Sequence, residues 1–259
     1  MISVENVGHH FGVRPVLQDV CFSVPQWKTL AIIGPNGTGK TTLLNIVAGL
    51  FASEAGTVSI GGHTRRSTLE EELAVRQQTF FLPAELWFPK GVTVRQYLLS
   101  VGELWGRDPL RLFEHADRLL KLFQLEELSN GEISAGSTGQ QKKVALCSAL
   151  IAETPVLLLD EPFSGGLDPA GLTAMKQVLK HLTNRDDRTV VISSPVPELV
   201  EEVADDVLIL KDGLVLRHAS VSDIKAESEC STLAEALSQL VFPETAADLA
   251  AYFQQEATT

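Results

Sequence analysis

The sequence has few residues of the kinds that mark disulfide-bonded, metal-binding or membrane-spanning proteins. Its 259 residues include only three cysteines, Cys21, Cys147 and Cys230, which stand too far apart for a paired metal-ligand motif or a disulfide framework. No apolar run approaches the roughly 18 residues that would predict a membrane-spanning helix. The N-terminus also lacks the basic-then-apolar layout of a secretory signal. These absences predict a protein of the reducing cytoplasm.

Positive charge is scarce as well. Lysine and arginine number 21 against 33 acidic residues, for a net charge of −12. Affinity for nucleic acid usually rests on clustered cations, so this balance argues against a nucleic-acid partner. A single nucleotide is not excluded, because the amides of one loop can hold phosphates whatever the net charge of the protein.

Strands alternate with helices along the chain, which predicts an α/β layered domain. The first 24 residues favour short antiparallel strands, broken near FG and RP. Further strands are expected at 29–34, 56–62, 79–83, 156–160 and 189–193, with a hairpin at 207–216 that turns on Asp-Gly. Apolar residues at helical spacing mark 41–50, much of 85–135, 141–152, 168–183, about 197–204, and the tail 222–259.

The segment GPNGTGKT at 34–41 fits the phosphate-loop pattern G-x-x-x-x-G-K-[ST], directly after a predicted strand and before a predicted helix. Loop amides and the helix N-terminus would point donors at the phosphate oxygens. Lys40 would neutralise β/γ-phosphate charge, and the Thr41 hydroxyl would bind Mg²⁺. The predicted ATP-binding residues here are Gly34, Pro35, Asn36, Gly37, Thr38, Gly39, Lys40, Thr41 and Thr42.

A buried strand, VLLLD at 156–160, ends in a pair of acidic residues. Beside a phosphate loop, Asp160 would reach the Mg²⁺ through water. Glu161 would be the catalytic residue that orients or deprotonates the attacking water. We refer to the two carboxylates as the Walker B pair.

Between these motifs the sequence resembles the nucleotide-binding subunits of ATP-binding-cassette (ABC) transporters. GSTGQ at 136–140 is similar to the family signature Leu-Ser-Gly-Gly-Gln and matches it at Ser137, Gly139 and Gln140. In the family, the signature of one cassette caps the γ-phosphate that is bound to a second cassette, as a helix N-terminus caps an anion. Ser137 could equally be a simple helix N-cap.

Two shorter segments carry the same resemblance. GGLD at 165–168 looks like the D-loop of the family, with Asp168 as its aspartate. HHFG at 9–12 resembles the segment whose aromatic residue stacks on adenine, which would be Phe11. A core phenylalanine is the alternative at that position.

The resemblance covers residues 1–225 and implies a P-loop NTPase of the ABC type. Such a cassette has a mixed RecA-like core sheet, an antiparallel β subdomain and a helical subdomain, here inserted at about 85–135. Residues 226–259 would form a helical extension. Its segment 231–240 resembles the closing helix of drug and polysaccharide exporter ATPases, although an amphipathic packing helix explains it as well.

The resemblance also implies partners and a location. A second cassette is expected, as a homodimer or an asymmetric heterodimer, together with a separate multi-span membrane permease. The chain would then lie on the inner face of the cell membrane.

Two positions depart from the family pattern. Ala84 stands where the family has a glutamine that contacts the metal and the attacking water. Pro195 stands where the family has a histidine that donates a hydrogen bond to the γ-phosphate. Proline suits the first turn of a helix but offers no donor. Glu85 or the Ser194 hydroxyl could substitute in part.

The sequence therefore supports two functions. The first is an ATPase subunit of the exporter type that energises a permease and whose own site is expected to hydrolyse ATP slowly. The second is a regulatory or assembly module in which ATP binding switches dimerisation without significant hydrolysis. A third, a DNA- or ribosome-associated cassette, fits poorly with so acidic a chain.

Overall fold

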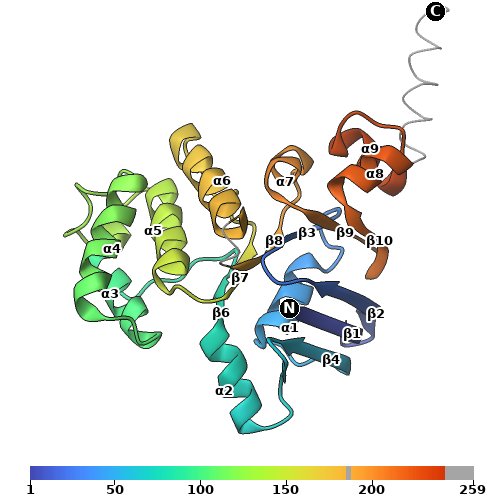
Figure 1. Ribbon diagram of the computed structural model, residues 1–259, viewed down its shortest axis with the longest axis horizontal. Coiled ribbons are helices and arrows are strands. Elements are labelled where there is room, and N and C mark those ends of the chain that lie inside the picture. The colour runs from blue at the N-terminus through green and yellow to red at the C-terminus, as the bar shows by residue number, and fades with distance from the viewer. Residues whose placement is uncertain (185–187, 243–259) are drawn as a thin grey trace, which may run out of the picture.

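The computed structural model describes residues 1–184 and 188–242 and arranges them around two β-sheets (Figure 1). A four-stranded sheet has the order β2-β1-β4-β5, and a six-stranded sheet has the order β10-β9-β3-β8-β7-β6. Helix α1 (Lys40–Ala48) packs between them, because its buried apolar side chains join one core cluster with strands of both sheets.

The smaller sheet is antiparallel and contains β1 (Ile2–Phe11), β2 (Arg14–Val24), β4 (Ala55–Ile60) and β5 (His63–Thr64). The expected antiparallel strands and the break at FG are confirmed, but the strands are not short and RP does not interrupt the second one. β1 and β2 are 10 and 11 residues long and are joined by a tight turn at Gly12 and Val13. FG marks the turn at which β1 ends, whereas β2 begins at Arg14 and runs through Pro15. Register shifts between Val4 and His10 let the long pair accommodate its irregular residues.

The larger sheet is mixed, as predicted. It contains β3 (Thr29–Ile33), β6 (Thr79–Leu82), β7 (Val156–Asp160), β8 (Thr189–Ser193), β9 (Asp206–Lys211) and β10 (Leu214–Ser220). Five strands run parallel, and β10 pairs antiparallel with β9. Every residue of β3, β7 and β8 is buried, which explains their unbroken apolar sequences. Parallel strands end at one edge, so the segments after β3, β7 and β8 meet there.

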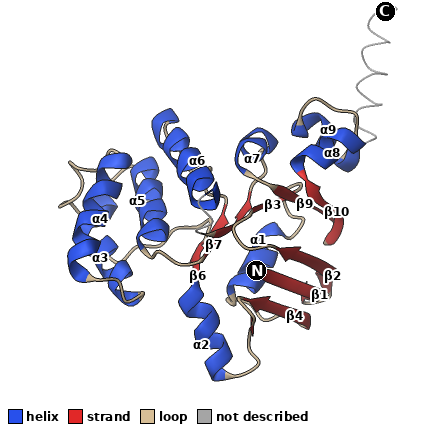
Figure 2. Ribbon diagram, viewed as in Figure 1, coloured by secondary structure: helices blue, strands red, loops and turns tan. Residues whose placement is uncertain are grey.

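The helical subdomain forms a lobe of its own beside the core sheet (Figure 2). It contains α3 (Val94–Leu104), α4 (Pro109–Leu122) and α5 (Thr138–Ile151), with a short 3₁₀ turn at Ile133–Ala135. Two more helices, α6 (Pro169–Asn184) and α7 (Pro197–Val203), flank the core strands β7 and β8. The fold is therefore the predicted P-loop architecture with an antiparallel β subdomain and a helical subdomain.

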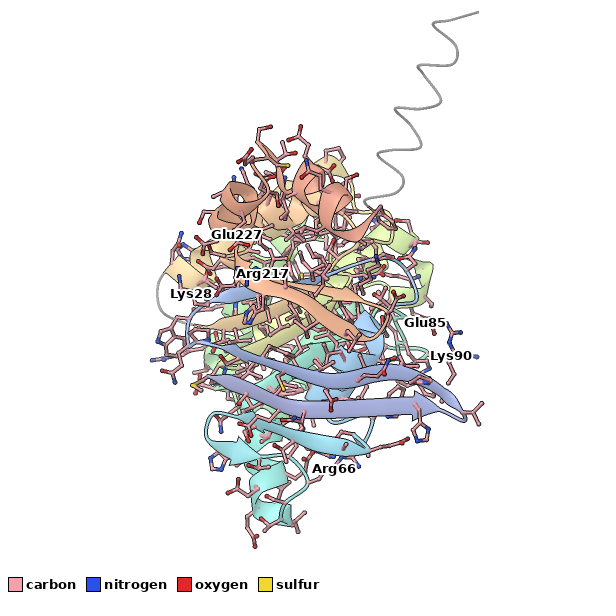
Figure 3. The ribbon with its side chains drawn as sticks, turned by 90° about the vertical axis from the view of Figure 1, so that its right-hand side faces the viewer. Lys28, Arg66, Glu85, Lys90, Arg217 and Glu227 are labelled. Atoms are coloured by element: carbon pink, nitrogen blue, oxygen red, sulfur yellow. The ribbon has the colours of Figure 1, made fainter. Side chains whose placement is uncertain are left out.

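Several helix predictions need correction. Helix α2 (Leu69–Gln78) was not predicted, because it buries only Val75 and so shows no apolar period. Residues 85–92 are not helical; α3 begins after Thr93, whose side chain forms a capping box with Gln96. The loop between β6 and α3 carries Glu85 and Lys90 at the surface (Figure 3).

The predicted helical tail contains two short helices, α8 (Val221–Glu227) and α9 (Leu233–Val241). Residues 243–259 of the predicted extension lie outside the described part of the chain. Within residues 1–184 and 188–242, no helix has the length and apolar character to span a membrane.

Candidate functional site

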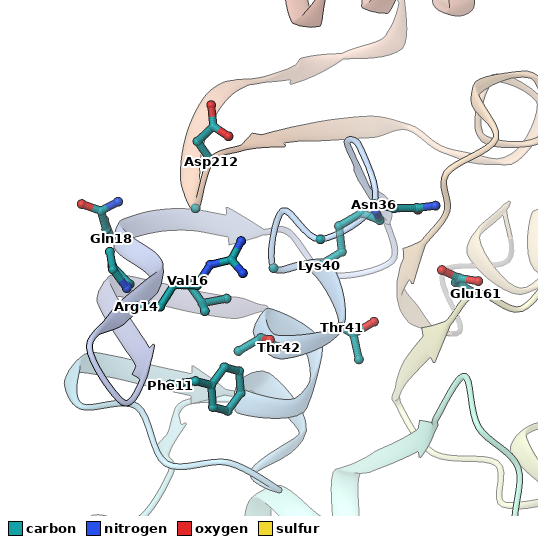
Figure 4. Close-up of a pocket in the computed structure, with 14 residues that line it drawn as sticks. Phe11, Arg14, Val16, Gln18, Asn36, Lys40, Thr41, Thr42, Glu161 and Asp212 are labelled. Atoms are coloured by element: carbon teal, nitrogen blue, oxygen red, sulfur yellow. The ribbon is translucent and has the colours of Figure 1, made fainter.

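The predicted phosphate loop connects β3 to α1 and lines a cavity of about 850 Å³ (Figure 4). Gly34 has a φ of 152°, and a methyl group there would lie 2.0 Å from the carbonyl oxygen of Leu210. Gly39 has a φ of 101° and serves as the N-cap of α1. The loop thus adopts a backbone path that only glycine permits at these positions, which leaves its amides free to bind phosphate.

Lys40 is buried at the base of the loop. Its Nζ donates to the carbonyl oxygens of Gly34 (2.8 Å) and Pro35 (2.9 Å). Burial lowers the pKa of Lys40, and the negative charges of Glu161 and Asp160 oppose that shift. Thr38 is also buried, and its hydroxyl donates to Pro35 O. Loop carbonyl oxygens thus hold the Lys40 ammonium group in a fixed position.

The other end of the cavity holds Phe11. Its side chain is 55% exposed, so it is not a core residue. His9 meets its ring edge-on at 4.9 Å between centroids, and Phe51 does so at 6.1 Å. A half-exposed ring held at the cavity wall suits stacking on a nucleobase.

Several cavity residues escaped the sequence analysis. They are Arg14, Pro15, Val16, Gln18, Asp212 and Gly213. The first four belong to the start of β2, and the last two form the β9–β10 turn. The two segments meet because the Gln18 N–H donates to Gly213 O at 2.9 Å. The Asp-Gly turn was visible in the sequence, but its place beside β2 depends on how the two sheets pack.

The Walker B pair lies at the end of β7. Asp160 is fully buried, and its Oδ1 accepts a hydrogen bond from the Ser193 hydroxyl. The Glu161 N–H donates to the same hydroxyl at 3.0 Å, and the Glu161 side chain lines the cavity opposite the phosphate loop (Figure 4). Sequence reasoning missed Ser193, whose role arises because β7 and β8 pair at Asp160 and Ser193.

The residues proposed for Mg²⁺ fit such an ion. Asp160 Oδ2 is buried and has no hydrogen-bond partner in the described residues, so it is free to act on a cation or its water. Thr41 lines the cavity beside Lys40. No group of three or more metal-ligating side chains occurs in residues 1–184 and 188–242. This donor set matches Mg²⁺, which commonly binds through one or two protein groups, substrate phosphates and water.

The signature residues lie at the start of α5 and do not line the cavity of their own chain. Ser137 Oγ accepts the Gln140 N–H at 3.3 Å, and Gln140 Oε1 accepts the Ser137 N–H at 2.9 Å. Ser137 is therefore an N-cap, and it remains exposed. The signature thus presents a capped helix start at the surface, away from the residues that line the cavity.

The signature packs directly on the predicted D-loop. A methyl group at Gly139 would lie 2.4 Å from the carbonyl oxygen of Gly166. Asp168 receives hydrogen bonds from Lys143 Nζ and from the Gly171 N–H, both at 2.7 Å. These two donors hold the pKa of Asp168 below its usual value. Asp168 therefore caps α6 and ties it to α5, and it does not line the cavity.

Ala84 and Pro195, the two positions that depart from the family pattern, both lie in loops that follow strands of the larger sheet. Ala84 is part of the loop after β6 and brings no polar side chain. Pro195 follows β8, is exposed, and lines a cleft of about 430 Å³ together with Gly34, Pro35 and Asn36. The Ser194 hydroxyl is buried and accepts the Val196 N–H at 3.1 Å, so it is occupied within its own turn.

Comparison with known proteins agrees with this geometry. The family model described as ABC transporter matches residues 17–164. A sulfate/thiosulfate import ATP-binding protein of Synechocystis is 33% identical over 86% of this chain, and the match spans 61% of that protein. A linearmycin resistance ATP-binding protein of Bacillus subtilis is 25% identical over 86% of this chain and 70% of its own length.

Solved structures give the same result. An ATP-binding subunit of an ABC transporter superposes with a TM-score of 0.85 at 25% identity, covering 93% of this chain and 99% of that one. The dimeric cassette MJ0796, bound to ADP and Pi, has a TM-score of 0.77 at 25% identity, covering 85% and 98%. Motifs, fold and relatives therefore agree that this chain belongs to the ABC transporter family, as an ATP-binding cassette.

Proposed function

We propose that the chain is the ATP-hydrolysing subunit of a membrane transporter, acting with a separate multi-span permease on the inner face of the cell membrane. The observation that carries this proposal is the cavity that joins the phosphate loop, Glu161 and Phe11. ATP would stack on Phe11 and place its phosphates on the loop, and Thr41 and Asp160 would hold Mg²⁺. Bound Mg²⁺ would neutralise part of the phosphate charge in the reaction.

A second cassette completes the proposed site. The exposed Ser137 and its neighbour Gly139 cannot serve the cavity of their own chain, whereas in a head-to-tail dimer they would cap the γ-phosphate of the partner. The dimeric state of a cassette of similar fold supports the pairing of two chains. Both a homodimer and an asymmetric heterodimer are compatible with it.

Hydrolysis at the chain's own site should be slow. Glu161 is present to orient or deprotonate water, but neither Ala84 nor Pro195 can donate a hydrogen bond from its side chain. Ser194 is already bonded within its turn. Removing one donor from developing charge typically slows an enzyme about 10²–10³-fold. ATP binding should survive, because it depends on the loop, Lys40 and Mg²⁺.

The permease is expected to dock on the helical subdomain. Leu104, the last residue of α3, and Trp87, in the loop before α3, are each 80% exposed. Leu104 also lines a cleft of about 600 Å³ between α2 and α3, together with Leu73 and Trp105. Exposed apolar side chains around a cleft are typical of a protein interface. Export is proposed as the direction because α9 forms where the sequence resembles exporter ATPases.

Activity is tested by steady-state ATP hydrolysis with the purified full chain, its Glu161→Gln variant and its Pro195→His variant. We expect slow, Glu161-dependent turnover and a gain of activity in Pro195→His. Fast turnover in the unmodified homodimer would refute the weakened site. Equal rates in wild type and Glu161→Gln would refute Glu161 as the catalytic residue.

The permease is tested by co-purification from the native host. We expect a multi-span protein with the wild-type chain and with the control Leu214→Glu, which changes an exposed leucine on β10, but not with Leu104→Glu. A second cassette in the same complex would identify the heterodimer. Retention of the membrane protein by Leu104→Glu would exclude this docking surface.

A second function is favoured by Ala84 and Pro195. The chain could be a regulatory module in which ATP binding switches dimerisation and no significant hydrolysis follows. Dimerisation would then depend on ATP equally in wild type and in Glu161→Gln, with no hydrolysis when the permease is added. Stimulation of hydrolysis by the permease would exclude this function.

A further inference from the structure

Helix α5 directs two consecutive buried lysines toward the segment after β7. Lys142 and Lys143 are only 2% and 5% exposed. Lys143 forms the ion pair with Asp168. A methyl group at Gly165 would lie 3.8 Å from Lys142 Cδ and 3.9 Å from its Cγ, so the Lys142 side chain runs along the turn that follows Glu161.

That turn is fixed on Glu161 itself. The N–H and the hydroxyl of Ser164 both donate to Glu161 O, at 3.1 and 2.9 Å. Lys142 therefore approaches the Walker B pair from the helical subdomain, whereas Lys40 approaches it from the phosphate loop. The charges of both lysines thus act on the same two carboxylates from different elements.

Lys142 differs from its neighbour because it has no ion pair and no side-chain hydrogen bond within residues 1–184 and 188–242. Burial lowers the pKa of Lys142, and the charges of Asp160 and, secondarily, Glu161 oppose that shift. The nearby acidic charge includes Asp160, whose Oδ2 also lacks a partner.

We propose that Lys142 is a positioning residue of the ATP site, whose fixed positive charge balances Asp160 and Glu161 and sets the Mg²⁺ concentration that the site requires. The inference rests on the proposed function, since it needs ATP and Mg²⁺ in the cavity. Lys142 would act through its charge alone. Because it belongs to α5, the helix that begins at the signature, it would couple that helix electrostatically to the Walker B pair of the same chain.

A fixed cation attracts ATP and repels Mg²⁺. Removing the charge should therefore weaken the binding of Mg²⁺-free ATP and, at saturating ATP, tighten the binding of Mg²⁺. If Lys142 only supports the structure, its replacement should weaken the binding of both ATP and Mg²⁺, because a distorted site binds both ligands less well. The opposite signs distinguish the two roles.

The test uses the full chain and two neutral variants, Lys142→Met and Lys142→Gln, with Lys142→Arg as the charge-preserving control. ATP is titrated calorimetrically in the presence of a chelator, and Mg²⁺ is then titrated at saturating ATP. For the neutral variants we expect roughly three- to tenfold weaker Mg²⁺-free ATP binding and Mg²⁺ binding tighter by a similar factor, as for unit charges that interact at a high effective dielectric constant. Lys142→Arg should match the wild type in both titrations.

Thermal unfolding identifies which neutral variant is folded, and Lys142→Gln replaces Lys142→Met if the latter is not. Unchanged dissociation constants for ATP and Mg²⁺, or weaker binding of both ligands, would overturn the role of Lys142 while leaving the proposed function intact. Failure of the wild-type chain to bind ATP even with Mg²⁺ would overturn the proposed function, and this inference with it.

Discussion

Replacing Ser193 with alanine removes only one hydroxyl group but should destabilise the protein strongly. The hydroxyl is completely buried, donates to Asp160 Oδ1 and accepts the Glu161 N–H. A hydrogen bond to a charged group contributes about 1.5–3 kcal/mol, and an unsatisfied buried donor costs about 1–3 kcal/mol. Because the two effects share one atom and are not additive, we expect the free energy of unfolding to fall by about 3–4 kcal/mol.

The measurement is equilibrium unfolding in urea, with Ser194→Ala as the matched control. Ser194 is the next residue along the chain and is also buried, but its hydroxyl makes a local bond to the Val196 N–H. Its loss should cost about 1 kcal/mol. If Ser193→Ala and Ser194→Ala shift the urea midpoint equally, with unchanged slopes, the role of Ser193 as the link between β7 and β8 is refuted.

Three further predictions concern the phosphate loop, the contact of Glu201 with helix α9, and the stacking of Phe11 on the nucleobase of ATP. Gly34→Ala should cost more than 2 kcal/mol by urea unfolding, because its methyl group would overlap a β9 carbonyl, whereas Gly37→Ala, which has open space, should cost about 1 kcal/mol. The pKa of Glu201 is held low by hydrogen bonds from Lys225 and from the first amide of α9. Ionised Glu201 therefore stabilises the fold fully above about pH 4.3, the pKa of an unfolded glutamate, and this stabilisation is lost as the pH falls through the lower pKa of Glu201 in the folded protein. The Glu201→Gln variant should therefore show a flatter dependence of unfolding free energy on pH in that acidic range. Phe11→Ala should weaken ATP binding about tenfold and leave inorganic phosphate binding unchanged, as loss of one stacking contact implies; equal weakening of both ligands would contradict stacking.

Much of the site could be predicted because its motifs are local. The phosphate loop needs a strand, a glycine-rich turn and a helix in immediate succession, and residues 29–48 contain all three. The Walker B strand is likewise apparent from its apolar run. The signature residues begin a capped helix, which a Ser-x-x-Gln pattern predicts.

Other features could not be predicted, because they depend on which strands become neighbours. Helix α2 has no apolar period, since Val75 is its one buried residue. Ser193 looked like an ordinary strand end, and only the pairing of β7 with β8 places its hydroxyl on Asp160. Lys142 looked like one basic residue of a helix, and only the packing of α5 shows that it is buried.

The sequence by itself indicated the phosphate loop, the strand that ends in the Walker B pair and the α/β class, because each shows in the pattern of residues along the chain. The tertiary structure decided how the cavity closes around Phe11, β2 and the β9–β10 turn, and which side chains face the two carboxylates. The physical reason is that burial and electrostatic interaction depend on distance in space. That distance is set by packing between segments that are not adjacent in the chain.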